Sequence, residues 1–168
     1  MLNPFLIERA KRYARKHGRF LGEWLGGGAD GEVWELDGNI IKAIIDERKY
    51  RNESQCYLRL TEHNIQSVCG FAVPRLIGLD DDLLIVEMGF VSPPYLLDFN
   101  KAYLDVAPDY YTSETKMADC DAERRENFGD DHWQVVRQIH ACLKQVGIYY
   151  MDTRPGNITF AEGDESDE

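Results

Sequence analysis

With 168 residues, 43% of them hydrophobic, the chain is long enough for one domain with a buried core but short for a two-lobed enzyme. Its formal charge of −11 excludes a general nucleic-acid binder, because such a protein needs a basic surface against the phosphates. No apolar run approaches the length of a membrane span, and four cysteines without a C-x-x-C pair favour a reducing cytoplasm over a disulfide framework or a zinc site.

Asn3 and Pro4 predict the start of a helix, because Asn is a favoured N-cap and Pro is favoured at the first helical position. Gly18 can end this helix, which gives a range of 4–17 with Phe5, Leu6, Ala10 and Tyr13 on its apolar face. Residues 1–20 are basic, whereas residues 161–168 form an acidic tail. We interpret the basic face as solvated, and a docking surface for an acidic partner is the alternative.

The segment 25–33 contains the pattern G-x-G-x-x-G-x-V, whose defined positions are Gly26, Gly28, Gly31 and Val33. Glycines let backbone N–H groups approach phosphates, and Lys42 follows on an apolar run where its ammonium group can neutralise charge. Residues 32–36 alternate in polarity, Asp37-Gly38 predicts a hairpin turn, and residues 39–45 form a second strand. Strands rather than a helix after the glycines disfavour a dinucleotide-binding unit, in which a helix would follow.

The middle of the chain predicts a helix over 46–61 and strands over 73–78 and 83–88, joined by an acidic turn at 80–82. With the glycine hairpin these elements indicate an α+β fold containing a five-stranded antiparallel sheet and one helix. The pattern weakens over 89–129, where we expect a linker, a short helix near 97–104 and a charged loop or helix. A helix follows, with Asp130 or Asp131 as its N-cap and Gly147 at its end. We expect Trp133, on the apolar face of this helix, to be a core residue. We expect Trp34 to be buried in the core as well.

Residues 147–160 read as strand, polar loop and strand, and the loop carries Asp152 and Asn157. In phosphoryl transfer the incoming hydroxyl needs an oriented proton acceptor, and Mg²⁺ needs oxygen ligands near the phosphates. Asp152 and Asn157 on one rigid loop supply both kinds of group. His140, on the preceding helix, is interpreted as a hydrogen-bonded core histidine.

In this order of motifs the chain resembles a protein kinase of a minimal and atypical kind, over about residues 21–160. The resemblance implies a single domain with a two-lobed fold: an N-lobe of residues 21–89 and a truncated, mainly helical C-lobe of residues 90–160. ATP and Mg²⁺ are the implied cofactors, and a protein is the implied substrate or regulatory partner.

The resemblance also assigns residues. The glycine loop (Gly26, Gly28, Gly31, Val33) and Lys42 would hold the phosphates of ATP. Glu53 would pair with Lys42, with Glu47 as the second candidate. Glu87 and Gly89 fall where the hinge offers backbone groups to adenine, after Val86 at the gatekeeper position. Asp152 would be the catalytic aspartate, Asn157 a metal ligand and Arg154 a group that steadies the transferred phosphate.

Two departures from the family pattern are visible. Tyr150-Met151 replaces the usual His-Arg, so regulation through a phosphorylated activation loop is not expected. No Asp-Phe-Gly follows Asn157, and Asp164 and Asp167 are weak substitutes for the metal ligand it would supply. Three hypotheses therefore stay open: a kinase acting on a Ser, Thr or Tyr hydroxyl, a pseudokinase that serves as a binding module, and a site completed by a second copy in a homo-oligomer.

Overall fold

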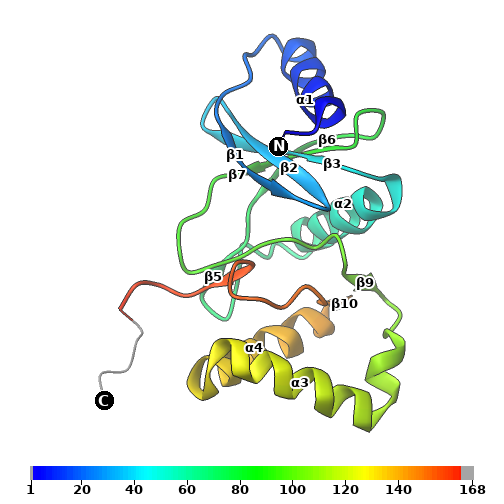
Figure 1. The fold of residues 1–168 in the computed structure, drawn as a ribbon, viewed down its shortest axis with the longest axis vertical. Coiled ribbons are helices and arrows are strands. Elements are labelled where there is room, and N and C mark those ends of the chain that lie inside the picture. Colours follow the sequence, from blue (N-terminus) through cyan, green and yellow to red (C-terminus); the bar gives the residue numbers. More distant parts are fainter. Residues whose placement is uncertain (1, 164–168) are drawn as a thin grey trace.

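The computed structural model describes residues 2–163, apart from the side chain of Tyr110, and has an α+β fold (Figure 1). Asp164 and Asp167, the weak metal candidates, and most of the acidic tail lie outside the described residues. The helices are α1 (Pro4–Lys16), α2 (Glu47–Glu62), α3 (Glu114–Phe128) and α4 (Asp130–Gln145), with a 3₁₀ helix η1 (Asp109–Thr112). The strands are β1 (Trp24–Gly28), β2 (Gly31–Leu36), β3 (Asn39–Ile44), β4 (Ser67–Val68), β5 (Phe71–Ala72), β6 (Leu76–Asp80), β7 (Ile85–Gly89), β8 (Tyr95–Leu96), β9 (Tyr103–Leu104), β10 (Ile148–Tyr149) and β11 (Ile158–Thr159).

The predicted five-stranded antiparallel sheet is confirmed, in the order β1-β2-β3-β7-β6. Its two faces follow from the alternation of side chains along a strand. On β3, Ile41 and Ala43 pack with helix α1, whereas Ile44 belongs to the cluster that includes residues of α2. Lys42 lies on the α2 face, because it alternates with Ile41 and Ala43, and this orientation positions the site described below.

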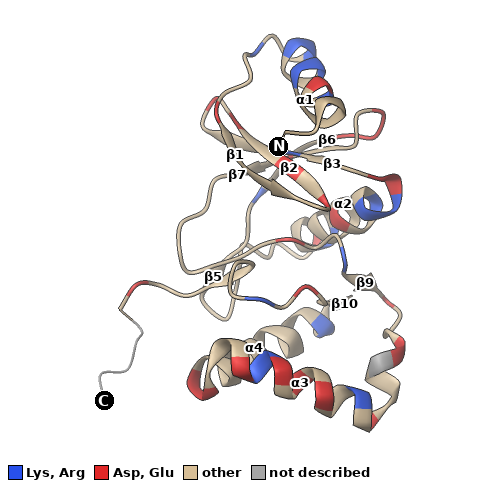
Figure 2. Cartoon of the chain, viewed as in Figure 1, with Lys and Arg blue, Asp and Glu red and all other residues tan. Residues whose placement is uncertain are grey.

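Helix α1 packs on the sheet through Leu6, Ala10 and Tyr13, a stripe with helical spacing. The prediction that Phe5 shares this face is wrong: Phe5 is 76% exposed, because it lies about 100° around the helix from Leu6. Figure 2 shows Lys and Arg residues along α1. Some of them hold the helix in place, since Arg9 donates to the Ile44 carbonyl at 2.9 Å and Lys16 pairs with Asp80 at 2.8 Å.

The helix predicted near residues 97–104 is wrong. These residues instead separate two short strands that pair with distant parts of the chain: β8 with β5 and β11, and β9 with β10. Asp98 has φ +65°, a left-handed conformation that does not continue a right-handed helix. Each of these pairings joins segments more than 20 residues apart and leaves no local pattern, so the sequence could not indicate it.

The charged segment after residue 113 is a helix, α3, whose N-cap Ser113 accepts a hydrogen bond from the Lys116 backbone. The predicted N-cap of α4 is wrong, because Gly129 occupies that position, whereas the predicted closure is confirmed: Gly147, with φ +78°, directly follows the C-cap Val146. Asp130 and Asp131 lie in the first turn, where their negative charges interact favourably with the positive end of the helix dipole.

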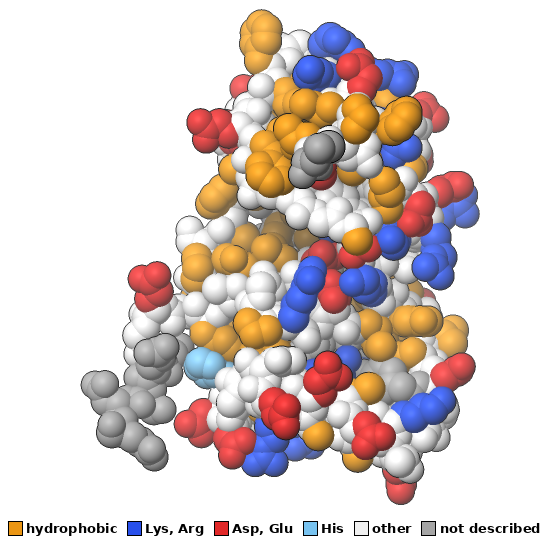
Figure 3. All heavy atoms as spheres, viewed as in Figure 1, with side chains coloured by type: hydrophobic (Ala, Val, Ile, Leu, Met, Phe, Trp, Pro, Cys, Tyr) orange, Lys and Arg blue, Asp and Glu red, His pale blue; other side chains and the backbone are white. Residues whose placement is uncertain are grey.

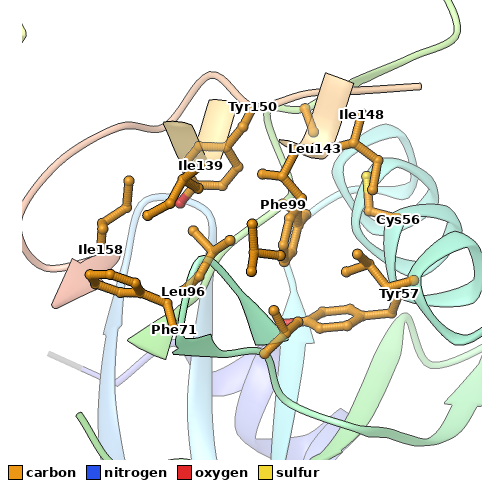
Figure 4. Close-up of a cluster of buried hydrophobic side chains, with 14 of the residues drawn as sticks. Cys56, Tyr57, Phe71, Leu96, Phe99, Ile139, Leu143, Ile148, Tyr150 and Ile158 are labelled. Carbon is orange, nitrogen blue, oxygen red and sulfur yellow. The ribbon is translucent and has the colours of Figure 1, made fainter. Parts of the chain in front are cut away.

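A continuous core joins the sheet to the helices below it (Figure 4). Tyr57 from α2, Phe99 and Tyr150 meet edge to face within it, with ring centroids 5.3 and 5.5 Å apart. Trp34 and Trp133 are both buried, as predicted. Across residues 2–163, no helix has both the length and the apolar character needed to cross a bilayer.

Candidate functional site

A cleft of about 820 Å³ lies between the five-stranded sheet and the chain below it, and Figure 3 shows the molecule hollowed there. This volume is in the range of small-molecule sites. Its upper wall is the glycine hairpin with Val33, Ile40 and Lys42. Its other walls come from Met88, residues 90–93, Asp98, Lys101, Arg154 and Asn157.

The glycine hairpin is a tight one, because Gly28 pairs with Gly31 and leaves only Ala29 and Asp30 in the turn. A Cβ on Gly31 would lie 2.5 Å from the Ala43 carbonyl oxygen, so the close approach of β2 to β3 requires glycine there. At the tip, Asp30 bonds Lys49 at 2.9 Å and Lys101 at 3.1 Å. Burial works against the charged form of Asp30, but these two lysines outweigh it and lower the pKa of Asp30 to about 2.

Lys42 lies under the hairpin and is almost completely buried. Its Nζ is 2.7 Å from Glu53 Oε2 and 3.2 Å from Asp98 Oδ1. Glu53 is therefore the helix partner, as expected, whereas Glu47 is exposed and bonds Arg51. Burial disfavours the charge on Lys42, but the two carboxylates overcome this penalty and raise the pKa of Lys42. A cation is thus held beneath the glycines.

Burial raises the pKa of Glu53 to about 7, in spite of the opposing charge of Lys42. The folded chain therefore retains a proton on Glu53 between about pH 4.5 and 7, where the unfolded chain releases it. Stability should fall as pH rises through this window, by about 2–3 kcal/mol. Glu53→Gln has no such proton and should lack this decline. Urea unfolding at pH 5 and pH 8 measures the difference, with exposed Glu47→Gln as control. Equal pH dependence in wild type and Glu53→Gln would contradict the prediction.

The loop between β10 and β11 carries the predicted acid and amide. Asn157 Nδ2 donates to the carbonyl and to Oδ2 of Asp152, at 2.9 and 3.0 Å, which leaves the Asn157 Oδ1 as an acceptor for a ligand. Arg154 and Lys101 each lie 3.4 Å from the Asp152 carboxylate. Asn157, Arg154 and Lys101 line the cleft, and all three contact the Asp152 carboxylate next to it.

His140 helps to fix this loop. Its Nε2 is 2.8 Å from Thr153 Oγ1, the residue after Asp152. Burial, aided by the charge of Arg124, lowers the pKa of His140 to about 4, so the ring is neutral near pH 7. The prediction of a hydrogen-bonded core histidine is confirmed.

Asp98 was not predicted, although it lies next to Lys42 in the cleft. Two hydrogen bonds fix the preceding residue to the Asp152 loop: the Leu97 N–H donates to the Asn157 carbonyl at 2.8 Å, and the Tyr150 hydroxyl donates to the Leu97 carbonyl. The following residue, Phe99, is buried against Tyr150. A carboxylate from a segment more than 50 residues earlier is thereby held beside the loop of Asp152 and Asn157.

Glu87 and Gly89, which the resemblance places at a hinge, are not among the residues that line the cleft. The Glu87 side chain projects to the α1 face of the sheet, where Arg19, Tyr13 and Asn39 bond it. The Gly89 N–H donates to the Arg75 carbonyl at 2.8 Å and is not free for a ligand. The Val86 side chain, which the resemblance places at the gatekeeper position, belongs to the buried core, and Met88 lines the cleft.

Comparison with protein-family models gives no match to this sequence, and a search of curated proteins finds no relative. The chemistry of the cleft is therefore inferred from its own residues.

Proposed function

We propose that this chain is a minimal protein kinase-like phosphotransferase, which binds ATP with Mg²⁺ in the cleft and transfers the γ-phosphate to a Ser, Thr or Tyr hydroxyl of a protein. In this proposal residues 21–89 act as the N-lobe and residues 90–160 as a truncated C-lobe. One observation carries it: the glycine hairpin, the Lys42–Glu53 pair, Asp98 and Asn157 line a single cleft, and Asn157 bonds the Asp152 carboxylate beside it.

The oxygen atoms at the cleft suit Mg²⁺ bound together with a nucleotide. Within residues 2–163, no three His, Cys, Asp or Glu side chains form a metal-binding group. Mg²⁺ beside phosphates normally takes only one or two protein oxygens, with phosphates and water as the other ligands. Asp98 and the Asn157 Oδ1 are hard oxygen donors of this kind. When bound, the ion would neutralise phosphate charge that Lys42 alone leaves uncompensated.

The chain's own groups fit the remaining tasks. Lys42, held by Glu53 and Asp98, supplies a fixed positive charge for the phosphates, and the hairpin limits access of water. Asp152 can orient the acceptor hydroxyl and take its proton. The new bond joins that oxygen to the γ-phosphorus, while the bond from phosphorus to the bridging oxygen of ADP breaks. Lys101 and Arg154 lie beside Asp152, where positive charge favours the transferred group.

The binding-module alternative was motivated by the absence of a second metal ligand after Asn157. Asp98 removes that motivation, since it provides a carboxylate at the same cleft from an earlier part of the chain. Catalysis is for this reason the function that we propose.

ATP with Mg²⁺ is expected to raise the midpoint of thermal unfolding, and Lys42→Met should weaken ATP binding by about 10- to 100-fold. This range corresponds to the 1.5–3 kcal/mol of a hydrogen bond to a charged group. Lys116→Met, at an exposed lysine, is the matched control and should bind ATP as wild type does.

Transfer of γ-labelled phosphate to a mixture of protein acceptors, with Asp152→Ala as the inactive reference, tests the reaction. Stabilisation without transfer would select the pseudokinase, and no stabilisation by ATP would overturn the proposal.

A further inference from the structure

Two exposed cysteines meet outside the cleft. The Sγ atoms of Cys69 and Cys142 are 3.5 Å apart, although the residues are 73 positions apart in the chain. Cys69 begins the two-residue turn between β4 and β5, and Cys142 lies on α4. A disulfide needs the sulfurs at about 2.05 Å, so a shift of roughly 1.5 Å, within reach of side-chain rotation, would join them.

The position of Cys69 strengthens this observation. The turn residues Cys69 and Gly70 both have positive φ, at +50° and +85°. Asn, Asp and Gly are the residues usually favoured in such a hairpin turn, because a Cβ is unfavourable in the left-handed region. Cys69 takes this strained conformation and its sulfur contacts a second thiol. Both cysteines are also exposed residues, so a dissolved oxidant can approach them.

We propose that Cys69 and Cys142 are a redox-active pair, which closes to a reversible disulfide between the β4–β5 turn and α4 when the chain meets a small-molecule disulfide such as oxidised glutathione. This inference goes beyond the proposed function and does not depend on it. The chain still suits a reducing compartment, because an exposed disulfide of this kind is open to reduction.

The reaction balances as two thiol–disulfide exchanges. The thiolate of one cysteine attacks a sulfur of oxidised glutathione, which forms a mixed disulfide and releases one glutathione thiolate. The thiolate of the second cysteine then attacks the protein sulfur of that mixed disulfide and releases the second glutathione. The two thiol protons pass to the two released glutathiones. The cysteine pair is oxidised by two electrons, and the glutathione disulfide is reduced by two.

The disulfide would connect the two segments that position Asp98 and Asp152. Strand β5 pairs with β8, which leads to Asp98, and α4 leads through β10 to Asp152. A cross-link from the β4–β5 turn to α4 would therefore hold these two segments together. Because it would close a loop of about 73 residues, it should also stabilise the folded chain.

The test is oxidation of the full chain with oxidised glutathione, followed by maleimide trapping in denaturant and mass spectrometry. Two of the four cysteines should escape the maleimide, with peptides containing Cys69 and Cys142 joined, and reduction should reverse this. The thermal midpoint of the oxidised chain should rise by at least about 5 °C. Cys120→Ser, as control, should behave as wild type, whereas Cys69→Ser and Cys142→Ser should retain a glutathione adduct on the remaining cysteine. Four reactive thiols in the wild type, or two separate adducts, would overturn the proposal.

Discussion

Replacing Asp98 with Asn is expected to lower the rate of phosphate transfer by about 10²- to 10³-fold, while ATP affinity changes far less. Asn keeps the shape of Asp98 but removes the charge that faces Lys42 at 3.2 Å and that would bind Mg²⁺. The magnitude follows the loss of one preorganised electrostatic group from an active site, about 3–4 kcal/mol. Lys42 keeps its bond to Glu53 in this variant, so the fold and the phosphate-binding charge should persist.

Two measurements test the expected effect of Asp98→Asn. The first is the transfer rate of Asp98→Asn against Asp119→Asn, an exposed aspartate on α3 that serves as the matched control. The second is the Mg²⁺ concentration that gives half of the thermal stabilisation by ATP, which should rise about tenfold or more for Asp98→Asn. The second readout does not require turnover. A variant that matches wild type in both measurements would show that Asp98 has no part in the site.

Local patterns account for the parts of the structure that could be predicted. The glycines, the turn at Asp37-Gly38 and the apolar runs on either side define β1 to β3, because hairpins form between neighbours in sequence. Asn3 and Gly18 bracket α1 in the same local way. Glu53 could be chosen as the partner of Lys42, since both residues lie on elements that are adjacent in the chain.

The parts that were missed depend on distant contacts. Asp98 reaches the cleft only because β8 pairs with β11, and two short strands so far apart carry no joint signal. The direction of the Glu87 side chain, in contrast, could be predicted, because the two-residue period of a strand places it opposite Val86 and Met88. Lys42 pairs in register with Val86, so Val86 and Met88 lie on the same face of the sheet as Lys42, and Glu87 lies on the opposite face.

The second large effect concerns this buried Glu87. Arg19→Met is expected to lower the free energy of unfolding by about 3 kcal/mol or more, because Glu87 is only 2% exposed and would lose its counter-ion. Arg19 donates two hydrogen bonds of 2.7 Å to Glu87, and Tyr13 and Asn39 donate one each. The matched control is Arg15→Met. Its pair with Glu8 is well exposed and should contribute less than about 1 kcal/mol.

The pH dependence gives an independent check. Burial acts to raise the pKa of Glu87, but the bonds from Arg19, Tyr13 and Asn39 lower it to about 2. Because the folded pKa lies below the unfolded value near 4.5, the stabilisation is complete above pH 4.5 and is lost as pH falls towards 2. Arg19→Met should lose part of this acid sensitivity, and adding Glu87→Gln should restore much of the stability, since no buried charge then remains unpaired. Urea unfolding of the single and double variants at pH 3 and pH 7 measures both effects. If Arg19→Met were no less stable than Arg15→Met, the buried Arg19–Glu87 pair would make no net contribution to stability.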